Sequence, residues 1–566
     1  MSTAAPAASR LHPTLAVLGR VGDRLARHVV VALGTIVTIQ VLATVALFFS
    51  VNRNGWLTYQ GGDQIWLATS GWLLGDGVVG YALTSHGWPL LLAPLTWLTG
   101  ASSVELLPLT TVLQVGVLGP IATLAVYDIG ARLAGRLAGL WCVAAFVSAP
   151  FASIPYFVDS YHDRWVDQFL PQALGLTQQA DFPSVVAVLV SVALTVRALE
   201  KGAYREAVLA GTFAGVAIAL KPSNALFLGG PALAFLLARR LDHAALFTIA
   251  LAPSLIALAL WKSKGLGEIP LFVQGELRLA TGADPVVGSL TSWFDRTVRL
   301  NFDTWKQNMS NLREFSWSAR VVQWLPVAGA LAVARRSVPA AGLLAGWLLG
   351  FVVIKGAADV ATVESGSYWR LIMPALPAFV LLVAAIPLLV PTLGERLGER
   401  LAPLPAGRPG LRTVVVIVAV TAIVPLAVLL AAKQSRAVPN TSPPPNFVSS
   451  SVVVAEIGVP VDDDVVRLDV RRTASGNELS WVDTTSRART FYRVYRASAA
   501  FPDLVCEPRG VDRCDLRAET LVITRETRFL DPEPPRDATY RIGVAANWLD
   551  DVERGDVFAL SPPAAP

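Results

Sequence analysis

Long apolar runs alternate with short polar segments through the first three-quarters of the chain. Runs of about 20 residues can cross the hydrocarbon core of a membrane as helices, because a helix satisfies its own backbone polar groups. About eleven spans are predicted, within residues 28–51, 104–127, 137–157, 184–196, 206–220, 225–238, 243–261, 319–334, 338–354, 371–393 and 414–432. The run 87–100 is shorter and contains two prolines, which favours a helix lying at the membrane interface.

The pattern changes after residue 437. The segment TSPPPN predicts a linker, and short alternating runs such as VVRLDVRR, TFYRVYRAS and ATYRIGVAAN follow it. Regularly spaced short strands predict an antiparallel β-sandwich. The predicted fold class is an α-helical polytopic membrane protein with a C-terminal all-β sandwich domain. Its predicted parts are an N-terminal segment 1–27, a transmembrane module 28–436, a linker 437–450 and a β-sandwich 451–566.

Composition and charge agree with this organisation. The chain is 53% hydrophobic and 16% charged, whereas a soluble domain carries about 25% charged residues. The net charge of +5 requires no nucleic-acid partner. Basic residues favour cytoplasmic loops, and they precede the first span and recur in alternate loops. We therefore expect a cytoplasmic N-terminus, an extracytoplasmic β-domain, and outer loops at 52–103, 158–183, 262–318 and 355–370 of a cell-membrane protein.

Chemically active side chains collect on the predicted outer face. Ionisable groups close to hydrocarbon are costly, so a functional role is the default hypothesis for them. Carboxylates there could act as bases or hold a metal, while Lys221 and Arg370 could hold an anionic group such as a phosphate. The whole set comprises Asp63, Asp76, His86, Asp159, His162, Asp163, Asp167, Asp181, Lys221, Glu364, Tyr368 and Arg370.

Four segments, taken in order, resemble the GT-C class of integral-membrane glycosyltransferases, which includes protein O-mannosyltransferases and the aminoarabinose transferases of lipid A. They are YQGGDQ after the first span, QQADFPSVVAVLV at the fourth, GVAIALKPSNALFL at the fifth, and YWRLIMPALPAFVLL near the tenth. The turn WLTG also resembles the end of the interfacial helix of that class. The resemblance covers residues 28–400 and depends on the order and common sidedness of the segments. Separately, the strands around Trp481 and YRVYRA resemble a fibronectin type III domain.

The GT-C resemblance implies transfer of a sugar, with inversion, from a polyprenyl-phosphate donor. The acceptor would be an envelope glycan, lipid or protein. Asp63 would be the general base, and Lys221, Arg370 and Tyr368 would bind the donor phosphate. Four further residues would orient the base or share a divalent cation such as Mg²⁺ or Mn²⁺, namely Asp181, His86, Asp159 and Asp163.

This chain departs from the class in two respects. Where the class usually has two adjacent acids, Asp-Glu or Asp-Asp, this chain has Asp63 followed by Gln64. The second outer loop is also longer than usual. Because of that length, Asp159, Asp163 and Asp181 compete for the second acidic role.

Structural roles remain open for several of these residues. Asp63 could cap the helix that follows it, and Asp76 suits a turn. His86 could be structural, and Lys221 could be an interfacial lysine whose stem covers apolar surface. At the level of function, the alternatives are a transporter or flippase of lipid-linked sugars, a non-enzymatic scaffold presenting the β-domain, and a ligase or polymerase of lipid-linked polymers.

The three cysteines have no spacing typical of a zinc or iron–sulfur site. Cys506 and Cys514 lie close together in the predicted outer domain, where an oxidising compartment would allow a disulfide. Two free thiols are the alternative.

Overall fold

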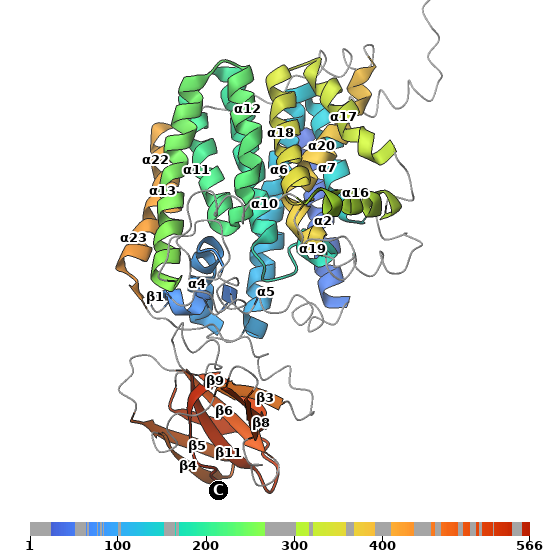
Figure 1. The fold of residues 1–566 in the computed structure, drawn as a ribbon. Helices are drawn as coiled ribbons and strands as arrows, with labels where there is room; N and C mark the ends of the chain where they lie inside the picture. The colour runs from blue at the N-terminus through green and yellow to red at the C-terminus, as the bar shows by residue number, and fades with distance from the viewer. Residues whose placement is uncertain are drawn as a thin grey trace, which may run out of the picture.

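The computed structural model has a body of packed helices with a β-structure at one end (Figure 1). The described residues of the helical body are 24–50 except 26, then 64, 67, 68, 70–75, 77–79, 82, 84–99, 103–151, 165, 169–266, 301–315, 321–357, 367–390 and 409–434. In the C-terminal part they are 454–458, 466–484, 491–497, 505–508, 512–524, 526–545 and 557–566.

Each predicted span coincides with helical structure over the residues that the structure describes. The first part of the body contains α2 (Val29–Ser50), α4 (Gly87–Thr99), α5 (Ser103–Leu113), η1 (Gln114–Leu118), α6 (Gly119–Ala134), α7 (Arg136–Ser148), η2 (Ala149–Phe151), α9 (Leu170–Ala173), α10 (Asp181–Lys201), α11 (Tyr204–Leu220), η4 (Pro222–Leu228) and α12 (Gly229–Leu237). The second part contains α13 (Leu241–Leu266), α16 (Phe302–Phe315), α17 (Val321–Ala334), α18 (Val338–Ile354), α19 (Ser367–Ile372), η5 (Met373–Ala375), α20 (Leu376–Ala385), η6 (Ile386–Leu389), α22 (Leu411–Val418), η7 (Ala419–Ile423) and α23 (Val424–Ala431).

The outer surface of the helical body is apolar. Among the described residues, six helices are long and apolar enough to cross a membrane, and shorter apolar helices accompany them. Large side chains such as Val30, Ile39 and Val416 are 59–73% exposed. Such a surface is unfavourable in water and suits contact with lipid. These features confirm the predicted polytopic helical fold.

Two details differ from the sequence-based expectation. The span predicted at 371–393 consists of α19, η5, α20 and η6, because Pro374, Pro377 and Pro387 interrupt regular helical bonding and leave 3₁₀ turns. In addition, the predicted outer loop 262–318 contains the helix α16. Figure 1 shows α16 lying across the direction of the neighbouring helices.

Basic and acidic residues join two spans at the end far from the β-structure. Arg132 pairs with Asp128 at 3.0 Å and also with Glu200, while Arg197 reaches Asp128 at 2.8 Å. These residues come from the ends of α6 and α10. The basic loops therefore meet at one end, as the alternation of charge along the sequence predicts.

Glycines bring α18 into backbone contact with η4 and α12. A Cβ added at Gly350 would overlap the carbonyl oxygen of Leu226, and one added at Gly230 would overlap that of Leu343. Small residues permit such close helix packing in membranes. These contacts fix how α18 is aligned along the antiparallel segment formed by η4 and α12.

The first outer segment is joined to the end of the last span. The two-residue strand β1 (Val78–Val79) pairs in parallel with β2 (Lys433–Gln434), and the Lys433 amide donates to the Gly77 carbonyl at 2.8 Å. Lys264 Nζ donates to the carbonyls of Leu429 and Ala432, both at 2.6 Å, at the C-terminal end of α23. The last described residues of the helical body, in β2, therefore lie beside β1.

The β-structure is formed by β3 (Val454–Gly458), β4 (Val466–Thr473), β5 (Gly476–Asp483), β6 (Phe491–Ala497), β7 (Val505–Pro508), β8 (Asp512–Arg517), β9 (Glu519–Thr524), β10 (Arg528–Asp531), β11 (Thr539–Ala545) and β12 (Val557–Leu560). One sheet has the order β10-β5-β4 and a second the order β12-β11-β6-β9. Trp481 of the first sheet and Val494 and Ile542 of the second share one apolar core. This arrangement confirms the predicted C-terminal β-domain, whose likeness to fibronectin type III remains a prediction.

A third sheet, β3-β8-β7, adds a hairpin to this domain. The register of β7 and β8 pairs Cys506 with Cys514. Directly opposed residues on antiparallel strands have Cα separations that a disulfide can bridge. The disulfide itself remains a prediction.

Candidate functional site

A buried carboxylate holds two cations where α10 begins and α11 ends, at the ends of these helices opposite the Arg132 network. Lys221 Nζ pairs with Asp181 Oδ1, and Arg370 Nε lies 3.4 Å from Asp181 Oδ2. Lys221 Nζ also donates to the Arg370 carbonyl at 3.0 Å. Three of the predicted site residues, from three different outer segments, therefore form one cluster.

Asp181 is the first residue of α10 and is only 2% exposed. Its carboxylate at a helix N-terminus is stabilised by the helix dipole as well as by the two cations. The Ser184 hydroxyl donates to the Asp181 carbonyl at 2.7 Å and fixes the first turn. The position of this carboxylate is therefore set by its own helix.

The loop before Asp181 is buried and held by side chains from three other segments. Gln64 Oε1 accepts from the Gln178 amide at 2.7 Å, and Trp88 Nε1 donates to the Gln178 carbonyl at 2.6 Å. Gln114 Nε2 donates to the Thr177 carbonyl at 2.5 Å. This network ties Gln64, the residue after Asp63 in the sequence, to the loop before α10.

Lys221 lies where α11 ends and η4 begins. Its backbone is extended, with φ −148° and ψ 108°, as expected for a residue that precedes a proline. Behind it, the Ser85 hydroxyl donates to the Leu220 carbonyl at 2.5 Å, and Asn224 Nδ2 donates to the Ala217 carbonyl at 2.9 Å. The Lys-Pro turn therefore has a defined shape that directs Lys221 towards Asp181.

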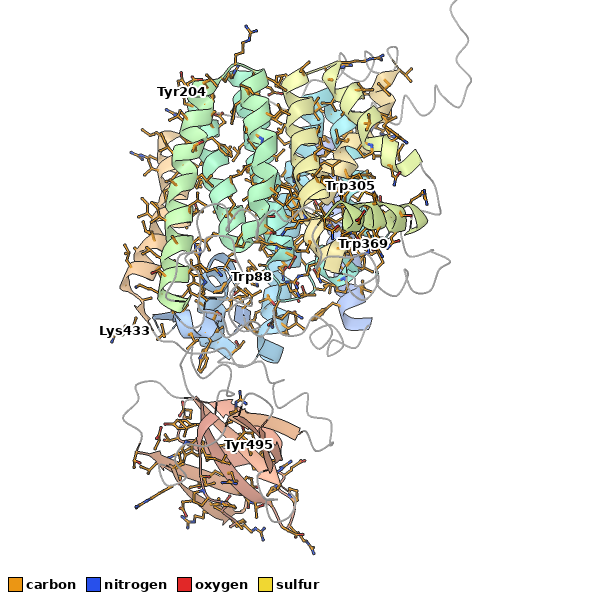
Figure 2. The ribbon with its side chains drawn as sticks, viewed as in Figure 1. Trp88, Tyr204, Trp305, Trp369, Lys433 and Tyr495 are labelled. Carbon is orange, nitrogen blue, oxygen red and sulfur yellow. The ribbon has the colours of Figure 1, made fainter. Side chains whose placement is uncertain are left out.

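Arg370 is carried by α19, which packs among aromatic rings. The ring centroids of Trp369 and Trp165 are 5.1 Å apart, and those of Trp165 and Phe169 are 4.1 Å apart. Tyr368 is fully buried and its hydroxyl has no hydrogen-bond partner among the described residues. Figure 2 shows Trp369 and Trp88 in the half of the helical body nearer the β-structure, with Tyr204 at the opposite end.

His86 is buried just before α4, close to the Lys-Pro turn. It is 1% exposed, and its Nδ1 has no partner in the part of the chain that the structure describes. Burial, with a further contribution from the charge of Lys262, lowers the pKa of His86 to about 3. The imidazole is consequently neutral at physiological pH, which favours a packing role.

A further cation near the cluster was not among the predicted site residues. Lys355 follows the last residue of α18, and burial, then the nearby charge of Lys221, lowers its pKa below the usual value. In the sequence, Lys355 looks like an ordinary basic residue at the end of an apolar run. Its proximity to Lys221 depends on helix packing, which no local motif reveals.

Several predicted residues lie outside the described part of the chain. Among the described residues no group of three or more His, Cys, Asp or Glu side chains could hold a metal ion. The divalent cation therefore remains a prediction. The predicted acids that are not described are Asp63, Asp76, Asp159, Asp163, Asp167 and Glu364, and His162 is also not described.

Comparison with known proteins gives weak structural matches. An archaeal oligosaccharyltransferase, AglB from Archaeoglobus fulgidus in complex with an inhibitory peptide and a dolichol-phosphate, matches 71% of this chain at 14% identity and a TM-score of 0.40. The apo form of the Archaeoglobus fulgidus oligosaccharyltransferase matches at 14% identity and its complex with Zn and sulfate at 15%, each with a TM-score of 0.39. These enzymes are of the GT-C class that the sequence resembles.

This chain covers 53–56% of the length of those structures, that is, about half. At this identity and score the similarity does not extend their activity to this chain. No family model matches the sequence, and no curated protein matches it.

Proposed function

We propose that this protein is a membrane glycosyltransferase that transfers a sugar from a polyprenyl-phosphate donor to an acceptor on the outer face of the cell membrane. The observation that carries the proposal is the Asp181–Lys221–Arg370 cluster, in which a buried carboxylate holds two cations at one end of the spans. The phosphate of a membrane lipid lies at the membrane surface, so it could reach a site at the end of the spans. The opposite end, which contains the Arg132 network, is the cytoplasmic end in this proposal.

The proposed reaction is an inverting displacement. The acceptor hydroxyl oxygen attacks the anomeric carbon of the sugar and its proton passes to the carboxylate of Asp63. The bond between the anomeric carbon and the phosphate oxygen breaks, and the electron pair remains on the phosphate. Lys221 and Arg370 stabilise the negative charge that develops there, which is where preorganised cations lower the barrier most.

Asp181 takes the role of positioning residue in this scheme. Both of its oxygens face cations, so it orients Lys221 and Arg370 and is a poor proton acceptor. Gln64, which follows Asp63 in the sequence, accepts a hydrogen bond from the loop that precedes Asp181, and this supports a place for the base near the cluster. The assistance of the base by Asp159 or Asp163 is an additional proposal. The participation of a divalent cation is another.

The distribution of charge argues against a flippase. A transporter of lipid-linked sugars needs a binding site near the membrane midplane. In the described spans, ionisable residues lie towards the helix ends, as with Asp181, Arg197 and Lys264. This distribution favours chemistry at the outer rim.

The proposal is tested by a transfer assay with the purified full-length protein and a panel of polyprenyl-phosphate sugars. Asp63→Asn should lower transfer at least about a thousandfold, because the amide cannot take the proton. Asp303→Asn is the matched control, since its side chain on α16 is 94% exposed, and it should retain wild-type activity. Full activity of Asp63→Asn would refute the role of Asp63 as the base. The absence of transfer with every donor would refute the proposal that the protein is a glycosyltransferase.

A further inference from the structure

An apolar cavity of about 280 Å³ lies between α6, α7 and α20, with η6 at one end. Glycine, alanine, leucine, proline, tryptophan and cysteine residues line it, so a water molecule inside would find few hydrogen-bond partners. Trp141 borders the cavity and is 54% exposed. The cavity therefore opens on the outer, apolar surface of the helical body, and it suits an apolar ligand.

The helices around the cavity are held together at fixed points. Trp141 Nε1 donates to the Ala384 carbonyl at 3.1 Å, which joins α7 to α20. A Cβ added at Gly130 in α6 would lie 2.8 Å from Cys142 Sγ in α7, and small residues permit this close approach in membranes. Because these contacts fix the walls, the helices cannot simply close the space between them.

A cation from the end of α17 lies next to the cavity. Arg335 Nη1 donates to the Leu389 carbonyl at 2.7 Å, and the adjacent Leu388 is a lining residue. The packing of α17 on α20 determines this position, since a Cβ added at Gly329 would overlap the Leu382 carbonyl oxygen. Arg335 is six residues beyond Gly329, and Leu388 is six residues beyond Leu382. Both chains therefore reach the same level at the end of the cavity.

The guanidinium of Arg335 can donate further hydrogen bonds. It has five N–H groups, and within the described part of the chain only the Leu389 carbonyl accepts from its side chain. Arg335 is also exposed. Arg136, the first residue of α7, adds positive charge directly before the lining residues Leu137 and Ala138. The apolar cavity thus has cations at one end.

We propose that this cavity binds an anionic phospholipid of the membrane, with part of an acyl chain between α7 and α20 and the phosphate against Arg335. A phospholipid joins an apolar chain to a phosphate, in the same order as the cavity and its cation. Arginine presents paired N–H groups that suit a phosphate, and basic pockets between membrane helices suit anionic head groups. Figure 1 shows α17, α20 and α7 beside one another.

The position and size of the cavity distinguish this ligand from others. The cavity lies at the Arg132 end of α6, whereas the Asp181 cluster lies at the opposite helix ends. The lipid site is therefore separate from the proposed donor site and does not depend on the proposed function. A second copy of the chain fits less well, because a helix with its side chains is about 10 Å across and exceeds the space available.

Native mass spectrometry of the purified full-length protein in detergent tests the proposal. The protein is titrated with phosphatidylglycerol or with phosphatidylcholine that has the same acyl chains. The wild type should bind one phosphatidylglycerol at least about fivefold more tightly than phosphatidylcholine, because basic residues at a membrane surface attract anionic lipids. Arg335→Gln should lose most of this preference. Arg412→Gln is the matched control and should keep it, since Arg412 is also exposed but lies in α22, on the other flank in Figure 1.

A second pair of variants tests the cavity itself. Ala138→Leu places a larger side chain in the space for the acyl chain, so it should weaken phosphatidylglycerol binding at least about fivefold, since each methylene group excluded from apolar contact lowers affinity. Ala144→Leu is the control and should bind like the wild type, because Ala144 is exposed on the same helix and is not part of the lining.

Three results would overturn the inference. Equal affinity of the wild type for the two lipids, or an unchanged preference in Arg335→Gln, would exclude recognition of the anionic head group. Unchanged binding by Ala138→Leu, with an unchanged melting temperature, would exclude the cavity as the site of the acyl chain. A mass increase of one whole chain in place of a lipid would identify a second copy as the occupant. The assay contains no sugar donor, so its outcome is independent of transfer.

Discussion

Both carboxylate oxygens of Asp181 face cations, and this fixes what each residue of the cluster can contribute. A carboxylate paired with Lys221 and Arg370 has little tendency to take a proton. If the proposed reaction takes place, the proton acceptor must be another acid, which is the role given to Asp63. Asp181 then matters through the positions of the two cations, which a static charge can maintain throughout the reaction.

His86 makes stability depend on pH. Its pKa is about 3 in the folded protein and 6.5 in the unfolded chain, so between these values the unfolded state binds more protons and stability falls as pH falls. At pH 5 this costs about 2 kcal/mol relative to pH 7.5. We expect the melting temperature of the detergent-solubilised protein to drop over this range, and His86→Gln to lose part of that drop.

His28 provides the control for this experiment, because its side chain is exposed at the start of the helical body. His28→Gln should show the same fall in melting temperature as the wild type. An identical pH profile for wild type and His86→Gln would contradict the buried neutral imidazole.

Single residues were predictable where a local motif marks them. Lys221 precedes a proline between two apolar runs, and Arg370 lies in YWRLIMP, so both stand out in the sequence. Asp181 is one of three candidate acids in the sequence, and its contacts with Lys221 and Arg370 become visible only in the folded chain. Lys355 was not found, because its position relative to Lys221 depends on the packing of Gly350 against Leu226.

At the scale of elements, the spans were predictable because length and apolarity alone decide whether a helix can cross a membrane. Proline positions explain the 3₁₀ turns η5 and η6, which interrupt a run that looks continuous. The helix α16 was not predicted, because FDTWKQNMSNLREF is too polar for a span, although its apolar residues 302, 305, 309, 312 and 315 recur at the spacing of an amphipathic helix. Its tryptophan and asparagines become informative only when the end of α18 lies beside them.

The contact between α18 and η4 should be intolerant of even one methyl group. Gly350→Ala places a Cβ against the Leu226 carbonyl oxygen, so the two segments must separate. We expect a loss of about 1–3 kcal/mol of stability, with a lower melting temperature. Gly34→Ala in α2 is the matched control, because a Cβ there meets nothing within 4 Å.

Gly34→Ala should leave the melting temperature unchanged or slightly raised, since alanine favours helix more than glycine does. Equal melting temperatures for Gly350→Ala and Gly34→Ala would show that the close packing of α18 against η4 does not contribute to the stability of the protein.

At the scale of the whole molecule, the alternation of basic loops predicts that the ends of α6 and α10 lie together, and the ion pairs of Arg132 and Arg197 join them. Which side of the membrane they face remains a prediction. The β-domain was predictable from its alternating strands, but the added hairpin β7-β8 was not placed beforehand. Sheet order depends on contacts between strands distant in sequence, which periodicity does not specify.

An extracytoplasmic β-domain predicts a disulfide between Cys506 and Cys514, which are opposed across β7 and β8. Trypsin cleavage after Arg509 and Arg513 separates the two cysteines, so their peptides should stay joined until a reductant is added. Mass spectrometry without reductant checks this. Cys142, buried in α7, should appear as a free thiol in the same sample, and two free thiols at 506 and 514 would argue for a cytoplasmic domain.

The pairing of β1 with β2 also gives the molecule a mechanical property. Lys433 and Gln434, where the chain departs towards the β-domain, are hydrogen-bonded to the segment around Val78 and Val79, and Lys264 clamps the helix end just before them. A pull on the β-domain is therefore borne first by this short parallel ladder and the lysine clamp. A load applied to the β-domain would therefore reach the segment around Val78 and Val79, seven residues before His86, before it reached the spans.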